Sequence, residues 1–177
     1  MEHKKGAQRS RIIEHVLDIP GKILSLHGQD NIAEFVLQTL CHDECFNLTK
    51  AAYFIDNPDF NHFQGIVGYS AQESFNHHPH SCWENPQAFG HHMKKAPFNQ
   101  RVRGLQSLSP KKKDQHNDHL VKNIANELEL INPQFCGLNL KNDNHGLFIF
   151  EEGAGTGEWK TEDLKRALCL LGFCPVF

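Results

Sequence analysis

The sequence has no long apolar run. No stretch of the chain approaches the roughly 20 apolar residues that a helix needs to cross a bilayer, so we expect no membrane-spanning helix. The first ten residues are mostly charged or polar and lead into an amphipathic segment, unlike the apolar core of a secretory signal. These two absences make a cytoplasmic location the expectation.

Signatures of nucleotide-binding and repeat proteins are also missing. The glycine-rich run 152–158 has neither the lysine of a phosphate-binding loop nor the glycine spacing of the dinucleotide fingerprint, and acidic residues flank it. It therefore predicts a flexible loop. No internal repeat is visible, which speaks against a repeat architecture.

The composition that remains is typical of a globular protein. Hydrophobic residues make up 39% and charged residues 22% of the 177 positions, and a chain of this length can bury a substantial core. We therefore predict a single globular domain over residues 1–177. The six cysteines could form three disulfides, but without a secretory signal we expect reduced thiols.

Charge is distributed unevenly along the chain. Residues 94–113 contain seven lysines and arginines and no acidic side chain, although the net charge of the whole chain is −3. Such a segment can face an anionic small molecule, for which Arg101 and Arg103 are the candidate anion-binding residues. Alternatively, Pro97 and a Ser-Pro pair favour a basic exposed connector over 94–113. Nucleic-acid binding is not expected, because Phe98 is the lone aromatic residue of the segment.

Apolar periodicity predicts four helices and two hairpins. The helices are expected at about 8–18, 31–41, 117–131 and 161–171, the first ending before a Pro-Gly pair. Strands are expected at about 50–56 and 63–70, then at 134–140 and 145–151, the last apolar on both faces and therefore central. Gly65 and Gly68 indicate a bulge or a closely packed neighbour. The order predicts an α+β fold: an antiparallel sheet built from hairpins with about four helices packed mainly on one face.

The most unusual stretch is the histidine-rich segment from Phe75 to His92. It contains five of the thirteen histidines, together with a cysteine, a tryptophan and a glutamate. Pro79 disfavours a helix, and in an extended chain alternate side chains share one face. The turn signal Asn85-Pro86 would then bring the later histidines back alongside. The candidate metal ligands are His78, His80, Cys82, Glu84, His91 and His92.

These donors predict a divalent metal ion, Zn or Fe, because both metals accept imidazole, thiolate and carboxylate ligands. The spacing His78-x-His80-x-x-x-Glu84 is similar to the first metal-binding motif of the cupin superfamily, in which two histidines and a glutamate hold one ion. The resemblance covers only the segment from His78 to Glu84. No upstream glycine and no second motif are recognisable, and the helix content departs from a double-sheet barrel. The resemblance implies only that this spacing can chelate.

Two functions remain open. The protein is either a metal-dependent hydrolase or oxidoreductase acting on an anionic small molecule, or a non-enzymatic ligand- or partner-binding regulatory module whose His-rich segment is a structural clip or a plain loop. Thiol chemistry at Cys82, activated by nearby histidines, is a third interpretation. Cys41 and Cys45, one helical turn apart, either join a metal site or mark a frayed helix end. The sequence does not indicate the oligomeric state.

Overall fold

The structure is a computed structural model that describes residues 2–26, 29–57, 62–75, 81–108, 118–141, 144–155 and 159–174. Its helices are α1 (Glu2–Ser25), α2 (Ile32–Cys41), η1 (Ala71–Glu73), α3 (Ser81–Glu84), α4 (Pro86–Lys95), α5 (Pro97–Gly104), α6 (Asp118–Glu127), α7 (Thr161–Leu168) and η2 (Cys169–Phe173). Its strands are β1 (Leu48–Asn57), β2 (His62–Ser70), β3 (Gln106–Leu108), β4 (Gln134–Asn139) and β5 (His145–Glu152). Within these ranges no helix is long and apolar enough to cross a membrane.

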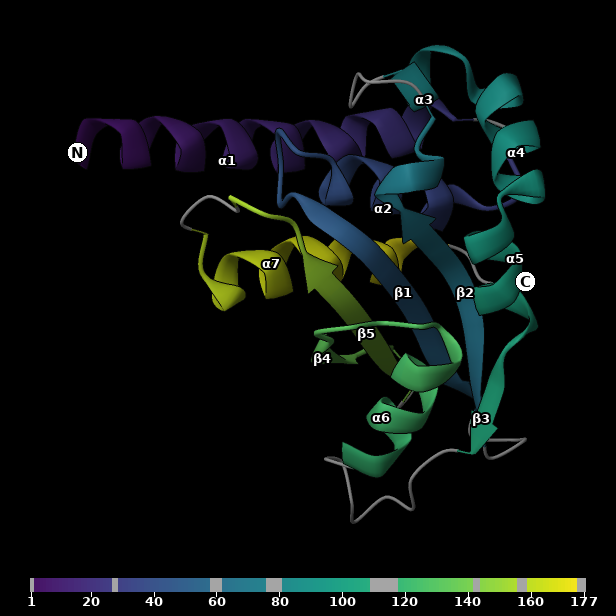
Figure 1. The fold of residues 1–177 in the computed structure, drawn as a ribbon. Helices are drawn as coiled ribbons and strands as arrows, with labels where there is room; N and C mark the ends of the chain where they lie inside the picture. The colour runs from purple at the N-terminus through teal and green to yellow at the C-terminus, as the bar shows by residue number, and fades with distance from the viewer. Residues whose placement is uncertain are drawn as a thin grey trace.

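The five strands form one antiparallel sheet in the order β3-β2-β1-β5-β4 (Figure 1). β1 and β2 are one hairpin and β4 and β5 the other, as the sequence predicts. β5 lies between β1 and β4, which confirms its predicted central place. The short edge strand β3 was not predicted and pairs only with residues 62–64 of β2. The α+β prediction with a hairpin-built sheet is thus confirmed, with more helices than expected.

The two faces of the sheet carry two separate cores. Side chains alternate along a strand, so Tyr53 and Phe148 enter the larger core while Phe54 and Ile149 enter the other. Helices α1, α2, α3, α4 and α7 contribute to the larger core, and α5 and α6 to the second. Most of the helices therefore pack on one face, as predicted.

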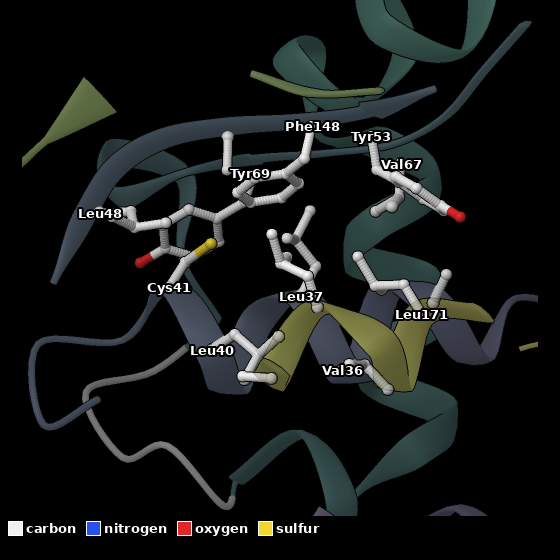
Figure 2. Close-up of a cluster of buried hydrophobic side chains, with 14 of the residues drawn as sticks. Val36, Leu37, Leu40, Cys41, Leu48, Tyr53, Val67, Tyr69, Phe148 and Leu171 are labelled. Atoms are coloured by element: carbon white, nitrogen blue, oxygen red, sulfur yellow. The ribbon is translucent and has the colours of Figure 1, made fainter. Parts of the chain in front are cut away.

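The larger core is built where α2 crosses the sheet. Figure 2 shows Leu37 of α2 and Leu171 of η2 on the side of the sheet that Tyr53, Tyr69 and Phe148 face, with Leu37 below the Phe148 ring. All five of these side chains are buried. Full burial of a large apolar side chain contributes about 1.5–3 kcal/mol, so this contact holds α2 and η2 on the same face of the sheet.

The second face is closed by α5 lying directly on β2. A Cβ added to Gly65 would lie 1.8 Å from the carbonyl oxygen of Val102, and one added to Gly68 would lie 2.6 Å from the Val102 Cγ2. The pairing of β1 with β2 also shifts register between Tyr53 and Phe54. The prediction for these glycines is a bulge or a closely packed neighbour, and the closely packed neighbour is confirmed, with a register irregularity beside it.

Helix α1 is longer than the sequence predicts. We expected an end before Pro20, but the helix continues to Ser25. Proline removes one backbone hydrogen bond and crowds the preceding turn, yet Ile12 and Ile19 are buried in the larger core. Packing of this face explains why the helix persists through Pro20. Figure 1 shows the N-terminal end of α1 extending beyond α2 and the sheet.

The basic segment is not a connector over the part that the structure describes, 94–108. Pro97 starts helix α5, because a proline in the first helical turn lacks only an N–H that would have no partner there. Phe98 and Val102, four residues apart, are buried against β2. The basic side chains themselves, Lys94, Lys95, Arg101 and Arg103, are exposed. Residues 109–113 lie outside the described residues.

Candidate functional site

The histidine-rich segment is helical over the part that the structure describes. His78 and His80 fall in residues 76–80, which lie outside the described residues. After them the extended chain that we predicted is wrong, because residues 81–84 form α3 and Asn85 then caps α4. The Asn85 Oδ1 accepts a hydrogen bond of 3.4 Å from the Ala88 N–H. Asn85-Pro86 is therefore a helix start rather than a turn, and Cys82 does not share a strand face with Glu84.

The thiol of Cys82 lies in the core and not in an open site. Its exposed fraction is 0%, and burial raises its pKa to about 12, although a hydrogen bond with Thr39 lowers it in part. Its neighbour Trp83 donates its Nε1–H to the Thr39 hydroxyl at 2.8 Å. A thiolate is costly at this position, which disfavours both a metal ligand and an activated nucleophile at Cys82. Glu84 is exposed.

The two later histidines are also directed elsewhere. His91 is exposed. The Nε2 of His92 lies 2.5 Å from the carbonyl oxygen of Glu73. A carbonyl can only accept, so Nε2 donates in this contact and only Nδ1 would keep a lone pair for a metal. The His92 ring also lies 5.4 Å from the ring of Phe75. These two contacts hold the His92 side chain of α4 against Glu73 and Phe75.

No group of three potential metal ligands is found among the described residues. Cys41 and Cys45 are both buried, and no third described donor joins them to make such a group. Figure 2 shows Cys41 within the core beside Tyr69. His42 is buried next to the Asp43 carboxylate, with Nδ1 and Oδ1 2.7 Å apart. The described donors are therefore dispersed, and the metal prediction now depends on residues outside them.

The two candidate anion-binding arginines face carboxylates of the protein itself. The Nη1 of Arg101 lies 3.3 Å from the Glu129 Oε2, and the Nη1 of Arg103 lies 3.5 Å from the Glu34 Oε1. An arginine already paired with a carboxylate offers less to an external anion. The geometry thus gives no support to a small-molecule anion site at this pair.

The structure reveals instead a polar cluster that covers the outer edge of β2. The Gly65 N–H donates to the Leu105 carbonyl at 3.1 Å and the Gly68 N–H donates to the Asn99 Oδ1 at 2.9 Å. The Asn31 Nδ2 donates to the Ile66 carbonyl at 3.3 Å. Backbone groups that β3 is too short to reach are therefore satisfied by α5 and by the start of α2. Gly65 and Gly68 predict a close neighbour here, but no sequence signal indicates which residues provide these hydrogen bonds.

Asn99 connects this edge to a buried carboxylate. Its Nδ2 donates to both the Glu34 Oε1 and the Met93 carbonyl, each at 2.9 Å. Glu34 is 4% exposed, and burial raises its pKa, while the hydrogen bond from Asn99 and the charge of Arg103 lower it in part. The cluster satisfies its polar groups internally, as buried polar groups require.

The opposite edge, at β4, has no such cover among the described residues. β4 pairs with β5 along its whole length, from Gln134 opposite Phe150 to Asn139 opposite His145. Within the described ranges no backbone hydrogen bond reaches the outer side of β4. Phe135 on this strand is 39% exposed. This edge can accept another strand.

A second exposed apolar feature lies on α1. Ile13, Leu17 and Leu24 are 49%, 71% and 78% exposed, and their spacing of four and seven residues places them along one side of the helix. We call these three residues the α1 stripe. It runs beside the face whose Ile12 and Ile19 are buried.

No family model, curated protein sequence or solved structure matches this chain. The surfaces and contacts described above are therefore the evidence for function.

Proposed function

We propose that the protein is a non-enzymatic protein-binding module, and that a partner protein docks an amphipathic helix along the α1 stripe. The observation that supports this proposal is the exposure of Leu17 and Leu24, at 71% and 78%, on a helix whose adjacent face is packed. Aligned exposed apolar side chains of this kind are typical of interaction surfaces.

The shape of the α1 stripe favours a helix as the partner. From Ile13 to Leu24 it follows about 16 Å of helix axis at 1.5 Å per residue, which is three turns. Rows of side chains on one helix pack into the grooves of another. Burial of the three side chains would contribute up to roughly 5 kcal/mol before the cost of association, so the complex is expected to be transient.

The charges next to the α1 stripe differ between its two sides. Glu14 and Asp18 lie on one side of it, and Arg9, one turn before Ile13, is already paired with Asp163 on the other. A partner helix with basic residues opposite Glu14 and Asp18 would complement both the apolar stripe and the flanking charge.

The test is site-specific photo-crosslinking in cell extract from the source of the protein. A photoreactive phenylalanine analogue at position 17 is expected to give adducts that mass spectrometry maps to an amphipathic helical segment of one partner. The same analogue at position 11, which lies on a different side of the helix, is the control. We expect the adduct to be lost when unlabelled wild type is added in excess and retained when the unlabelled competitor carries Leu17→Glu. Equal labelling from both positions, or adducts with lipid alone, would refute the proposal.

The metal-dependent function stays a prediction. Its remaining support is the sequence spacing of His78 and His80, because the described candidates Cys82 and His92 are directed elsewhere. Elemental analysis of purified, untagged protein tests it. Stoichiometric zinc or iron that is lost on His80→Ala would restore it in place of the non-enzymatic proposal.

A further inference from the structure

The outer edge of β4 lacks the devices that normally prevent strand addition. Edge strands are usually protected by charged side chains, proline, a bulge or short length. The six residues of β4, Gln-Phe-Cys-Gly-Leu-Asn, include no charge and no proline, and their register with β5 is continuous without a bulge. Among the described residues no element hydrogen-bonds to this edge. The strand is therefore a template for another strand.

We propose that β4 pairs antiparallel with β4 of a second copy of this chain, joining the two sheets edge to edge. The register we assign is centred on Cys136, which then lies opposite the partner's Cys136. In this register Phe135 lies opposite the partner's Gly137, and the contact occurs twice because the pair is symmetric. This inference concerns a different surface from the α1 stripe and does not depend on it.

The side chains of β4 are self-complementary in this register. Cys136 and Leu138 are buried, so Phe135 and Gly137 share the opposite face of the strand. Phe135 is partly exposed at 39%, and a Cβ added to Gly137 would meet nothing within 4 Å. The open space above Gly137 can thus receive an aromatic ring from the strand alongside, a pairing that compensates for glycine in sheets.

Charge supports a second copy as the occupant. Self-pairing of a charged strand would place like charges opposite each other, which is destabilising. β4 carries no charge along its length, so antiparallel pairing with itself meets no repulsion. The contact is limited to six residues from each copy, and we expect a weak dimer that forms as concentration rises.

Sedimentation equilibrium of the full chain tests the proposal. We expect a monomer–dimer equilibrium between about 10 µM and 1 mM. Gly137→Lys should weaken dimerisation by at least about tenfold, because the charged lysine side chain would occupy the space that receives the partner's Phe135 ring. We expect the variant to fold, since a Cβ added to Gly137 meets nothing within 4 Å. Gly104→Lys is the matched control, because Gly104 on α5 also has open space around it, and it should dimerise as wild type does.

The register is tested by a mixture of two variants. Phe135→Lys and Gly137→Glu should each be monomeric alone over most of this range, and an equimolar mixture should form a heterodimer through a lysine–glutamate pair across the strands. Monomer at every concentration, dimerisation unaffected by Gly137→Lys, or loss of the dimer only on Leu17→Glu would each overturn the proposal. The last result would assign self-association to the α1 stripe.

Discussion

The two edges of the sheet differ in how their backbone groups are satisfied. Along β2, groups beyond the reach of β3 are bonded by Asn31, Asn99 and the Leu105 carbonyl. Along β4, no such partner is found among the described residues. A buried or sealed edge is part of the folded core, whereas an open edge is available for association. The difference indicates that β4 is the edge at which another chain could add a strand.

The largest difference in stability between the two edges is expected when a Cβ is added to Gly65 on β2 and to Gly137 on β4. Gly65→Ala places a Cβ 1.8 Å from the carbonyl oxygen of Val102, and since backbone must move, we expect a loss of at least about 2 kcal/mol in the free energy of unfolding. Gly137→Ala at the open edge is the matched control and should change stability by less than about 0.5 kcal/mol. Urea unfolding monitored by circular dichroism measures both, and equal losses would contradict the comparison.

The second effect concerns the residue that seals β2. Asn99→Ala removes the partner of the Gly68 N–H and one partner of the buried Glu34 carboxylate, which keeps Arg103. Loss of these two hydrogen bonds should cost about 2 kcal/mol in the free energy of unfolding. Amide exchange at Gly68 should accelerate more than at neighbouring β1. The control is Gln100, the exposed neighbour of Asn99, which donates to the Lys94 carbonyl. Gln100→Ala should cost less than about 1 kcal/mol.

The smallest effect is the pH dependence that Glu34 gives to the sealed edge. Burial raises the pKa of Glu34 in the folded state above the ordinary value of 4.5. Between the pKa of the unfolded state and this higher pKa, the folded state binds more protons than the unfolded state. Stability then falls as pH rises through this window. Glu34→Gln lacks this titration, so the stability of wild type relative to the variant should decrease from pH 4.5 upward. A difference that increases with pH in urea unfolding would contradict the assignment.

The sheet could be predicted from the sequence because its signals are local. Alternating apolar residues and turn residues predict both hairpins, and the apolar run in β5 predicts its central place. Helix α2 follows from apolar spacing after Asn31. The signals missed at α4 and α5 were also local. Pro86 and Pro97 each stand in the first turn of a helix, a position that proline favours as much as the turn and the connector that we predict from the sequence.

The candidate site could not be predicted, because its features depend on contacts distant in sequence. Nothing local shows that the Cys82 thiol is buried or that His92 bonds the Glu73 carbonyl. The bond between Asn99 and Glu34 joins residues 65 positions apart. Pro20 within α1 is a related case, since burial of Ile19 outweighs the local preference to end the helix.

The asymmetry of the edges also limits the size of any assembly. A sheet open on both sides can add copies at either end and lengthen into a fibre. On the other side of the sheet the outer strand β3 has only three residues, and beyond it Asn31 and Asn99 bond the positions on β2 that an incoming strand would need. This leaves β4 as the longer template, and once two copies join there we expect the assembly to close at two subunits.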